Sequence, residues 1–188
     1  MDITWHGLSS FEIKTSTPNG DIKIVVDPYD NSTGLRFPRT LQAELVLSSH
    51  DEDDANNSAA VGGEPYLVDM AGEFEVKNIF VFGIHAPLKR EHKKKPVPNL
   101  IFRIEAESMQ IAHLGALDRA LTDDELRQLK NIDILMVPVG GERVMGPKIA
   151  AEVIAQIEPR VVIPMTHSLP SLKESLGTVQ DFCKEFGS

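Results

Sequence analysis

The chain has 188 residues, of which 41% are hydrophobic and 25% charged, and its formal net charge is −9. This length suits one globular domain, assigned here to residues 1–188, and the ordinary composition argues against disorder. A surface that tracks phosphates needs a net basic face, so the acidic balance disfavours nucleic-acid binding. One basic run, residues 89–95, is the exception.

A single cysteine, Cys183, excludes an internal disulfide framework and any cysteine-based zinc cluster. The N-terminus begins with a strand pattern rather than a basic segment followed by an apolar one. No stretch approaches about 18 consecutive apolar residues. We therefore expect a cytoplasmic protein that makes no membrane contact.

Short apolar or alternating segments predict strands through most of the N-terminal half. The sequence Pro18-Asn19-Gly20 predicts a hairpin turn, and Lys77-Asn78 predicts a second one. The basic segment 90–98 is expected to be a solvated loop. The predicted strands span residues 2–5, 9–14, 21–26, 44–47, 66–68, 72–76 and 79–84.

The C-terminal half predicts a further hairpin and then strands that alternate with helices. Thr122 and Glu125 form the pattern of a capping box, which starts a helix that Asn131 ends. Pro147 suits the first position of a helix through Ile157. The remaining expectations are strands at 99–106, 108–112, 133–137 and 160–164, and one or two helices in 171–188, with Thr178 as a cap.

A charged loop follows the buried strand predicted at 44–47. Residues 48–57 contain two serines, one histidine, four consecutive acids and two asparagines, a composition that the interior of a strand would not tolerate. In layered α/β domains, loops at strand ends carry the chemistry. The loop is therefore the first place to look for a site.

The octet Ser49-His50-Asp51-Glu52-Asp53-Asp54-Ala55-Asn56 resembles the metallo-β-lactamase signature S-H-x-H-x-D-H-N. In that family, three histidines and an aspartate of the signature hold one or two zinc ions. His50 and Asp54 match the signature. Glu52 and Ala55 stand where the family has its second and third histidines.

Other segments resemble the same family in the same order along the chain. The segment from Trp5 to Phe11 is similar to the W-x-G-H-S/A-x-F opening of ascorbate-6-phosphate lactonase-like hydrolases, with Leu8 at the histidine position. Asp27 follows a similar strand end, where we interpret it as a turn former. Further similar segments are His113-Leu114-Gly115-Ala116-Leu117 (family H-L-G-D-L), Pro138-Val139-Gly140-Gly141 (P-V-G-G) and Val162-Ile163-Pro164-Met165-Thr166-His167 (V-I-P-M-H-Y).

The resemblance implies an α+β fold, the αβ/βα four-layer sandwich, in which two mixed β-sheets are flanked by helices. It also implies that most metal ligands have been replaced. Of seven ligand positions, the chain keeps His50 and Asp54, whereas a zinc ion needs about three protein ligands. The other five positions hold Glu52, Ala55, Leu88, Ala116 and Thr166.

We accordingly predict a degenerate, noncatalytic binding or assembly protein that holds no metal or other cofactor and whose partner is an unknown small molecule or protein. Its vestigial pocket is expected to leave carboxylates facing one another, which raises at least one pKa unless His50 or His113 is protonated to compensate. Asp54→Asn should then not destabilise the protein strongly, and stabilisation is an open outcome. The residues of this expected pocket are His50, Glu52, Asp54, His113, Ala116, Thr166 and His167.

The alternative is a metal-dependent hydrolase with a rewired site that acts on an ester, lactone or phosphoester. Its ligands would be His50, Glu52 and Asp54, and the sequence leaves open whether His85, His113 or His167 replaces a lost ligand. The metal would be zinc or another divalent cation, and a carboxylate-rich site favours Mg²⁺, Mn²⁺ or Ca²⁺ over zinc. The oligomeric state is open.

Overall fold

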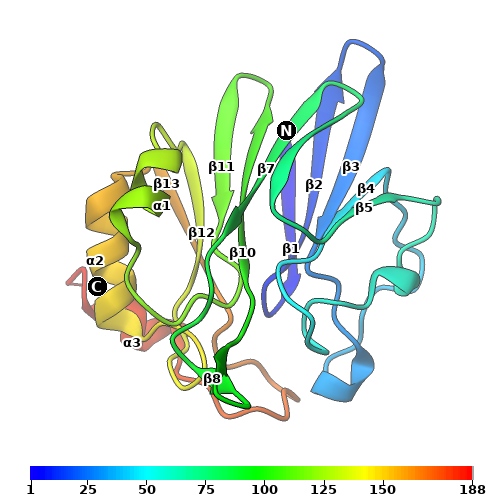
Figure 1. The fold of residues 1–188 in the computed structure, drawn as a ribbon. Helices are drawn as coiled ribbons and strands as arrows, with labels where there is room; N and C mark the ends of the chain where they lie inside the picture. The colour runs from blue at the N-terminus through cyan, green and yellow to red at the C-terminus, as the bar shows by residue number, and fades with distance from the viewer. Residues whose placement is uncertain (188) are drawn as a thin grey trace.

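A computed structural model describes residues 1–187 and contains two β-sheets packed face to face (Figure 1). The first sheet consists, in spatial order, of β1 (Asp2–Gly7), β2 (Ser10–Thr17), β3 (Gly20–Val26), β4 (Leu45–Leu47) and β5 (Tyr66–Val68). The second consists, in spatial order, of β13 (Val161–Met165), β12 (Ile134–Pro138), β11 (Met109–His113), β10 (Leu100–Ala106), β7 (Ile79–His85) and β6 (Gly72–Val76).

Both sheets are mixed. In the first sheet β3, β4 and β5 run parallel, and in the second β11, β12 and β13 do so, while the other neighbours pair antiparallel. The two layers and their helices confirm the α+β sandwich that the resemblance implied. A small separate hairpin pairs β8 (Glu91–His92) with β9 (Lys95–Pro96), so the basic segment predicted as a loop contains a short hairpin.

Strand alternation builds the core because successive side chains point to opposite faces of a sheet. In β4, Leu45 and Leu47 are fully buried between the two sheets, where they join residues such as Phe102 of β10. Val46 points the other way, into a cluster on the outer face of the first sheet with Tyr29. Each fully buried aliphatic side chain of this kind contributes about 1.5–3 kcal/mol.

Three helices lie along the outer side of the second sheet (Figure 1): α1 (Asp123–Gln128), α2 (Pro147–Ile157) and α3 (Val179–Lys184). Ala150 and Val153 of α2 pack into the same cluster as Leu135 and Val137 of β12. In the described part of the chain, only loops and two single 3₁₀ turns, Asn31–Thr33 and Ser58–Ala60, flank the outer face of the first sheet.

The predicted caps of the helices are confirmed. Thr122 and Glu125 form the capping box of α1, Pro147 occupies the first turn of α2, and Thr178 caps α3. The tail is less helical than expected, because residues 171–177 form a loop. Backbone bonds hold this loop to distant segments, from Lys173 N–H to the Thr33 carbonyl and from Gly177 N–H to the Gly140 carbonyl, in place of helical bonds. Ser188 lies outside the described residues.

The predicted hairpin turns also form. Lys77 and Asn78 both have positive φ, as do Glu107 and Ser108, which is the backbone that tight hairpins require. The Glu107 carboxylate then accepts hydrogen bonds from Thr15 Oγ1 at 2.9 Å and from Ser16 N–H at 2.8 Å, and thereby joins the two sheets. No helix in residues 1–187 is long and apolar enough to cross a membrane.

Candidate metal centre

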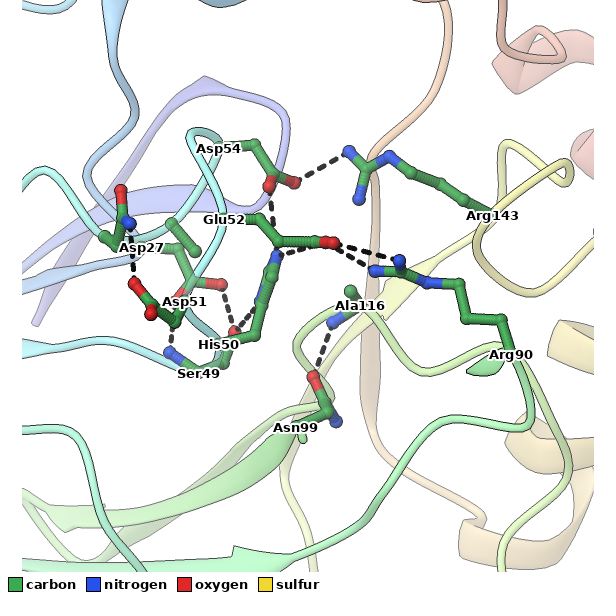
Figure 2. Close-up of polar contacts among 12 residues, drawn as sticks. Asp27, Ser49, His50, Asp51, Glu52, Asp54, Arg90, Asn99, Ala116 and Arg143 are labelled. Carbon is green, nitrogen blue, oxygen red and sulfur yellow. Dashed lines mark hydrogen bonds and ion pairs between the residues drawn. The ribbon is translucent and has the colours of Figure 1, made fainter. Parts of the chain in front are cut away.

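The charged loop after β4 folds into a tight turn that gathers its side chains. Its first residue, Ser48, still donates its N–H to the Val68 carbonyl of β5, but the chain then leaves the sheet. The N–H groups of Ala55 and Asn56 both donate to the Glu52 carbonyl, at 2.9 and 3.1 Å. This turn brings His50, Glu52 and Asp54 together (Figure 2).

A buried aspartate at the end of β3 orients His50. Asp27 is fully buried, and its two carboxylate oxygens accept from Ser49 N–H and Ser49 Oγ–H, each at 2.7 Å (Figure 2). Ser49 Oγ also lies 2.8 Å from His50 Nδ1. The single hydroxyl proton of Ser49 is given to the carboxylate, so Ser49 Oγ accepts the proton of His50 Nδ1. Asp27, interpreted from the sequence as a turn former, therefore also sets the tautomer of His50.

With Nδ1 protonated, the other ring nitrogen of His50 faces acids. His50 Nε2 lies 3.0 Å from Asp54 Oδ1 and 3.8 Å from Glu52 Oε2. Burial on its own lowers the pKa of His50, but the hydrogen bond to Asp54 and the nearby negative charges outweigh it, so the pKa is raised. A proton or a metal cation between Nε2 and the carboxylates satisfies this arrangement.

Two arginines hold the carboxylates from the side opposite His50 (Figure 2). Arg143 donates through Nη2 to Asp54 Oδ2 at 2.7 Å and through Nε to Glu174 Oε1 at 2.6 Å. Arg90 forms a two-pronged pair with Glu52, including Nη1 to Oε1 at 2.9 Å. The expectation of mutually repelling carboxylates is therefore wrong. Burial raises the pKa of Asp54, but the hydrogen bond and charge of His50 and the charge of Arg143 outweigh this effect and lower it.

The three side chains fit a single metal ion. One ligand atom from each of His50, Glu52 and Asp54 lies within 4.8 Å of the others. Ligand atoms at about 2.1 Å from a tetrahedral metal are separated by about 3.4 Å, and His50 Nε2 lies 3.0 Å from Asp54 Oδ1 and 3.8 Å from Glu52 Oε2. Hydrogen bonds that hold ligands from outside, as Ser49, Arg90 and Arg143 do, are a usual feature of metal centres. Within residues 1–187, this is the group of acids and histidines close enough to share an ion.

His113 lies near this centre but is turned away from it. Its Nε2 donates to the Ser9 carbonyl at 2.8 Å and its Nδ1 accepts from Gly115 N–H at 3.2 Å, so neither nitrogen is free for a metal. Burial lowers the pKa of His113, and the charge of Asp27, whose Oδ2 is 3.8 Å from Nε2, does not compensate. His113 therefore stays neutral and serves as a structural connection.

This burial makes stability depend on pH. Below pH 6.5 the unfolded chain protonates His113 while the folded chain does not, so the folded state loses stability as pH falls. His113→Gln lacks the ionisable group. We expect the wild type to melt higher than this variant at pH 8 and the difference in Tm to narrow by pH 5. A difference that stays constant in thermal melts across this range would contradict a neutral, buried His113.

The loop after β11 places Ala116 beside the candidate centre (Figure 2). Asn99 Oδ1 accepts from Ala116 N–H at 2.9 Å, and Gly115 makes the turn with φ +61°. A Cβ at residue 115 would lie 2.9 Å from Ser49 Cβ, so the turn packs directly against the loop that carries His50. Ala116 supplies a methyl group to this edge of the site and no donor atom.

Thr166, His167 and His85 do not join the ligand group. Thr166 is buried with its N–H bonded to the Leu8 carbonyl. The ring of His167 packs on Trp5 at a centroid distance of 4.9 Å, and its Nδ1 is 3.2 Å from the Ser168 carbonyl oxygen. His85 is exposed and lines a cleft of about 540 Å³ that borders His50 but neither Glu52 nor Asp54.

The known proteins that this chain resembles are named as metal-dependent hydrolases, which agrees with the candidate metal centre. The family model of the beta-lactamase superfamily domain matches residues 2–166. A UPF0173 metal-dependent hydrolase of Thermodesulfovibrio yellowstonii is 28% identical over 98% of this chain and 84% of its own length, and one of Thermococcus onnurineus is 25% identical over 89% and 85%. The crystal structure of a Thermotoga maritima protein assigned to the Zn-dependent hydrolases of the metallo-β-lactamase superfamily superimposes with a TM-score of 0.82, at 32% identity, over 99% of this chain and 86% of that one. The chain belongs to the metallo-β-lactamase superfamily.

Two predictions from the sequence are wrong. The degenerate, noncatalytic pseudoenzyme and the absence of a metal cofactor both conflict with relatives named metal-dependent hydrolases and with the His50, Glu52 and Asp54 group. The error came from counting replaced ligands position by position. A carboxylate can itself serve as a metal ligand, and Glu52 lies close enough to His50 and Asp54 to share an ion with them.

The sequence reasoning also missed Arg90 and Arg143. The sequence predicts only that Arg90 belongs to a solvated basic loop, and it gives no role to Arg143 in the turn after β12. The Arg90 side chain meets Glu52 across 38 positions of sequence, and Arg143 meets Asp54 across 89. The excess of acids in the loop after β4 is the signal that cations had to come from elsewhere.

Proposed function

We propose that this protein is a metal-dependent hydrolase that uses one divalent cation, held by His50, Glu52 and Asp54. The observation that carries the proposal is His50, whose Nδ1 is committed to Ser49 while Nε2 faces Asp54 Oδ1 at 3.0 Å and Glu52 Oε2 at 3.8 Å. A neutral imidazole and two carboxylates provide the three protein ligands of an open catalytic site. Such a cation lowers the pKa of a water molecule and polarises the scissile group.

The residues of the chain give this site its orientation and limit it to one ion. Asp27 and Ser49 fix the ring of His50, and the guanidinium groups of Arg90 and Arg143 fix the carboxylates. The metallo-β-lactamase family carries further ligands at the positions of residues 55, 88 and 116. In this chain these residues are alanine, leucine and alanine, whose side chains have no donor atom. The proposed reaction is hydrolysis of an ester, lactone or phosphoester.

The test is metal uptake by protein purified without chelator, measured by elemental analysis and by titration with Mn²⁺ and Zn²⁺. We expect about one ion per chain in the wild type and none in His50→Ala. Asp51→Asn is the matched control, because Asp51 lies in the same loop but is exposed and bonds only to Asn56. Failure of the wild type to bind either ion, or equal binding by His50→Ala, would refute the proposal.

We further propose that the enzyme works in the cytoplasm on a small molecule. The single cysteine, Cys183, fits a reducing compartment, in which disulfides are rare. The overall charge of −9 disfavours tracking of a nucleic-acid backbone. Fractionation of cells that express the tagged protein tests the compartment, and its appearance in a secreted fraction would contradict it.

A further inference from the structure

We propose that the substrate is a phosphate ester whose phosphoryl group binds Arg143 beside the metal, an inference that rests on the proposed function. The first observation is an unused donor. Arg143 Nη2 bonds Asp54 and Nε bonds Glu174, while Nη1 is buried and has no partner within residues 1–187. Arg90 repeats the pattern, since both of its terminal nitrogens bond Glu52 and its buried Nε has no partner.

The second observation is where this donor lies. Arg143 shares the carboxylate of Asp54 with the proposed ion, because Oδ2 faces the guanidinium and Oδ1 faces His50 Nε2. An oxyanion that accepts from Nη1 therefore sits next to the ion and carries the scissile bond. A cleft of about 240 Å³ is lined by Glu52, Asp54 and Arg143 together with Thr33, Asp53 and Glu174. That volume is below the usual range for a whole ligand and suits a head group.

The fold holds Arg143 in place for this role. Residues 139–146 connect β12 to α2 in a tight turn, in which Val144 N–H donates to the Gly141 carbonyl and Gly141 N–H to the Met145 carbonyl. Met145 N–H donates to the Leu117 carbonyl, which joins this turn to the loop that carries Ala116. The guanidinium plane is thus preorganised, and its fork of donors matches the oxygens of phosphate.

The third observation is charge. Glu52, Asp53, Asp54 and Glu174 in the cleft carry −4, and Arg143 in the cleft and Arg90, which pairs with Glu52, carry +2, so a divalent cation brings this group of side chains to neutrality. The β8–β9 hairpin, which begins just after Arg90, then adds the exposed cations Lys93, Lys94 and Lys95 to an otherwise acidic protein. Figure 1 shows this hairpin projecting at the lower end of the second sheet. Once the metal is bound, the negative charge of the site is neutralised and no longer repels an anionic substrate.

The reaction balances without any further reagent. The oxygen of water bonds to phosphorus, the bond from phosphorus to the ester oxygen breaks, and that oxygen leaves with a proton. For a monoester, ROPO₃²⁻ and H₂O give ROH and HPO₄²⁻. Arg143 Nη1 stabilises the charge on the phosphoryl oxygens during this exchange, as preorganised donors do in phosphoryl transfer.

The binding test uses inorganic phosphate, titrated by calorimetry into wild-type protein before and after loading with Mn²⁺. We expect binding to the loaded protein and none to the metal-free protein, whose cleft keeps a net negative charge. Arg143→Gln should weaken phosphate binding by about tenfold or more while Mn²⁺ is retained. Arg143→Lys keeps the positive charge beside Asp54 but lacks Nη1, so it should fold and bind Mn²⁺ and still lose phosphate. The control, Arg160→Gln, changes an exposed arginine that pairs with Asp133 and should have no effect.

An activity test separates the substrate classes with p-nitrophenyl phosphate, bis(p-nitrophenyl) phosphate and p-nitrophenyl acetate. The proposal is supported if the wild type hydrolyses one of the phosphate esters and Arg143→Lys does not. Which of the two esters is hydrolysed then distinguishes a monoester substrate from a diester substrate. Loaded protein that binds Mn²⁺ but not phosphate, or that hydrolyses only the acetate, would overturn this inference and leave the proposed function intact. A wild type that takes up no ion would remove both.

Discussion

Asp27→Ala is expected to lower the free energy of unfolding by about 4 kcal/mol, the largest effect of any single substitution considered for this fold. The change strands two buried donors, Ser49 N–H and Ser49 Oγ–H, and each unsatisfied group costs about 1–3 kcal/mol. It also places alanine at φ +47°, a left-handed backbone that aspartate and asparagine tolerate better, which adds about 1 kcal/mol. Urea denaturation in EDTA measures the loss without any contribution from metal.

Two companion variants make this prediction specific. Asp27→Asn keeps the backbone preference and one acceptor oxygen, so it should lie between the wild type and Asp27→Ala. Asp2→Ala, at an exposed position of β1, should change stability by no more than about 0.5 kcal/mol. A loss below about 1 kcal/mol for Asp27→Ala would mean that Ser49 and His50 do not depend on the buried carboxylate.

Asp54→Asn is expected to lower stability by about 3 kcal/mol, or the Tm by roughly 6–12 °C, even with metal removed by EDTA. Asp54 is buried between His50 and Arg143, at 3.0 and 2.7 Å, and the amide removes the nearest negative charge from His50 and one of the two carboxylates that pair with Arg143. This outcome reverses the expectation from the sequence that the same change is not strongly destabilising. Asp51→Asn, in the same loop but exposed, should remain within about 0.5 kcal/mol of the wild type.

The pH dependence of this difference follows from the lowered pKa of Asp54. The folded protein holds the carboxylate ionised, so its stabilisation over asparagine is fully present above the unfolded pKa of 3.8 and is lost progressively as pH falls from there through the much lower folded pKa. Denaturation curves at pH 7 and at about pH 2.5 should therefore show a wide gap and then a narrower one. An equal gap at both values would show that the ion pairs do not stabilise the fold.

The candidate site was predictable from the sequence to the extent that one loop contains it. His50, Glu52 and Asp54 all lie in the turn after β4, and a tight turn brings side chains two and four residues apart to the same side. The resemblance of residues 49–56 to a metal-binding signature therefore pointed to the segment that holds the candidate site. Whether Glu52 completes a site or merely marks a lost histidine could not be read from the residue itself, since that depends on where its oxygens point.

Local patterns were enough to predict the strands, the hairpin turns and the helix caps, because alternation, Pro18-Asn19-Gly20 and the Thr122 capping box act over a few residues. The electrostatics of the site depend instead on how distant segments pack together. His113 was placed in the pocket by its motif, but its ring is bonded to Ser9, 104 positions away. Arg143 reaches Asp54 from a turn 89 positions away. Charge pairing acts through space, so neither local periodicity nor a motif can assign the partners of a buried carboxylate.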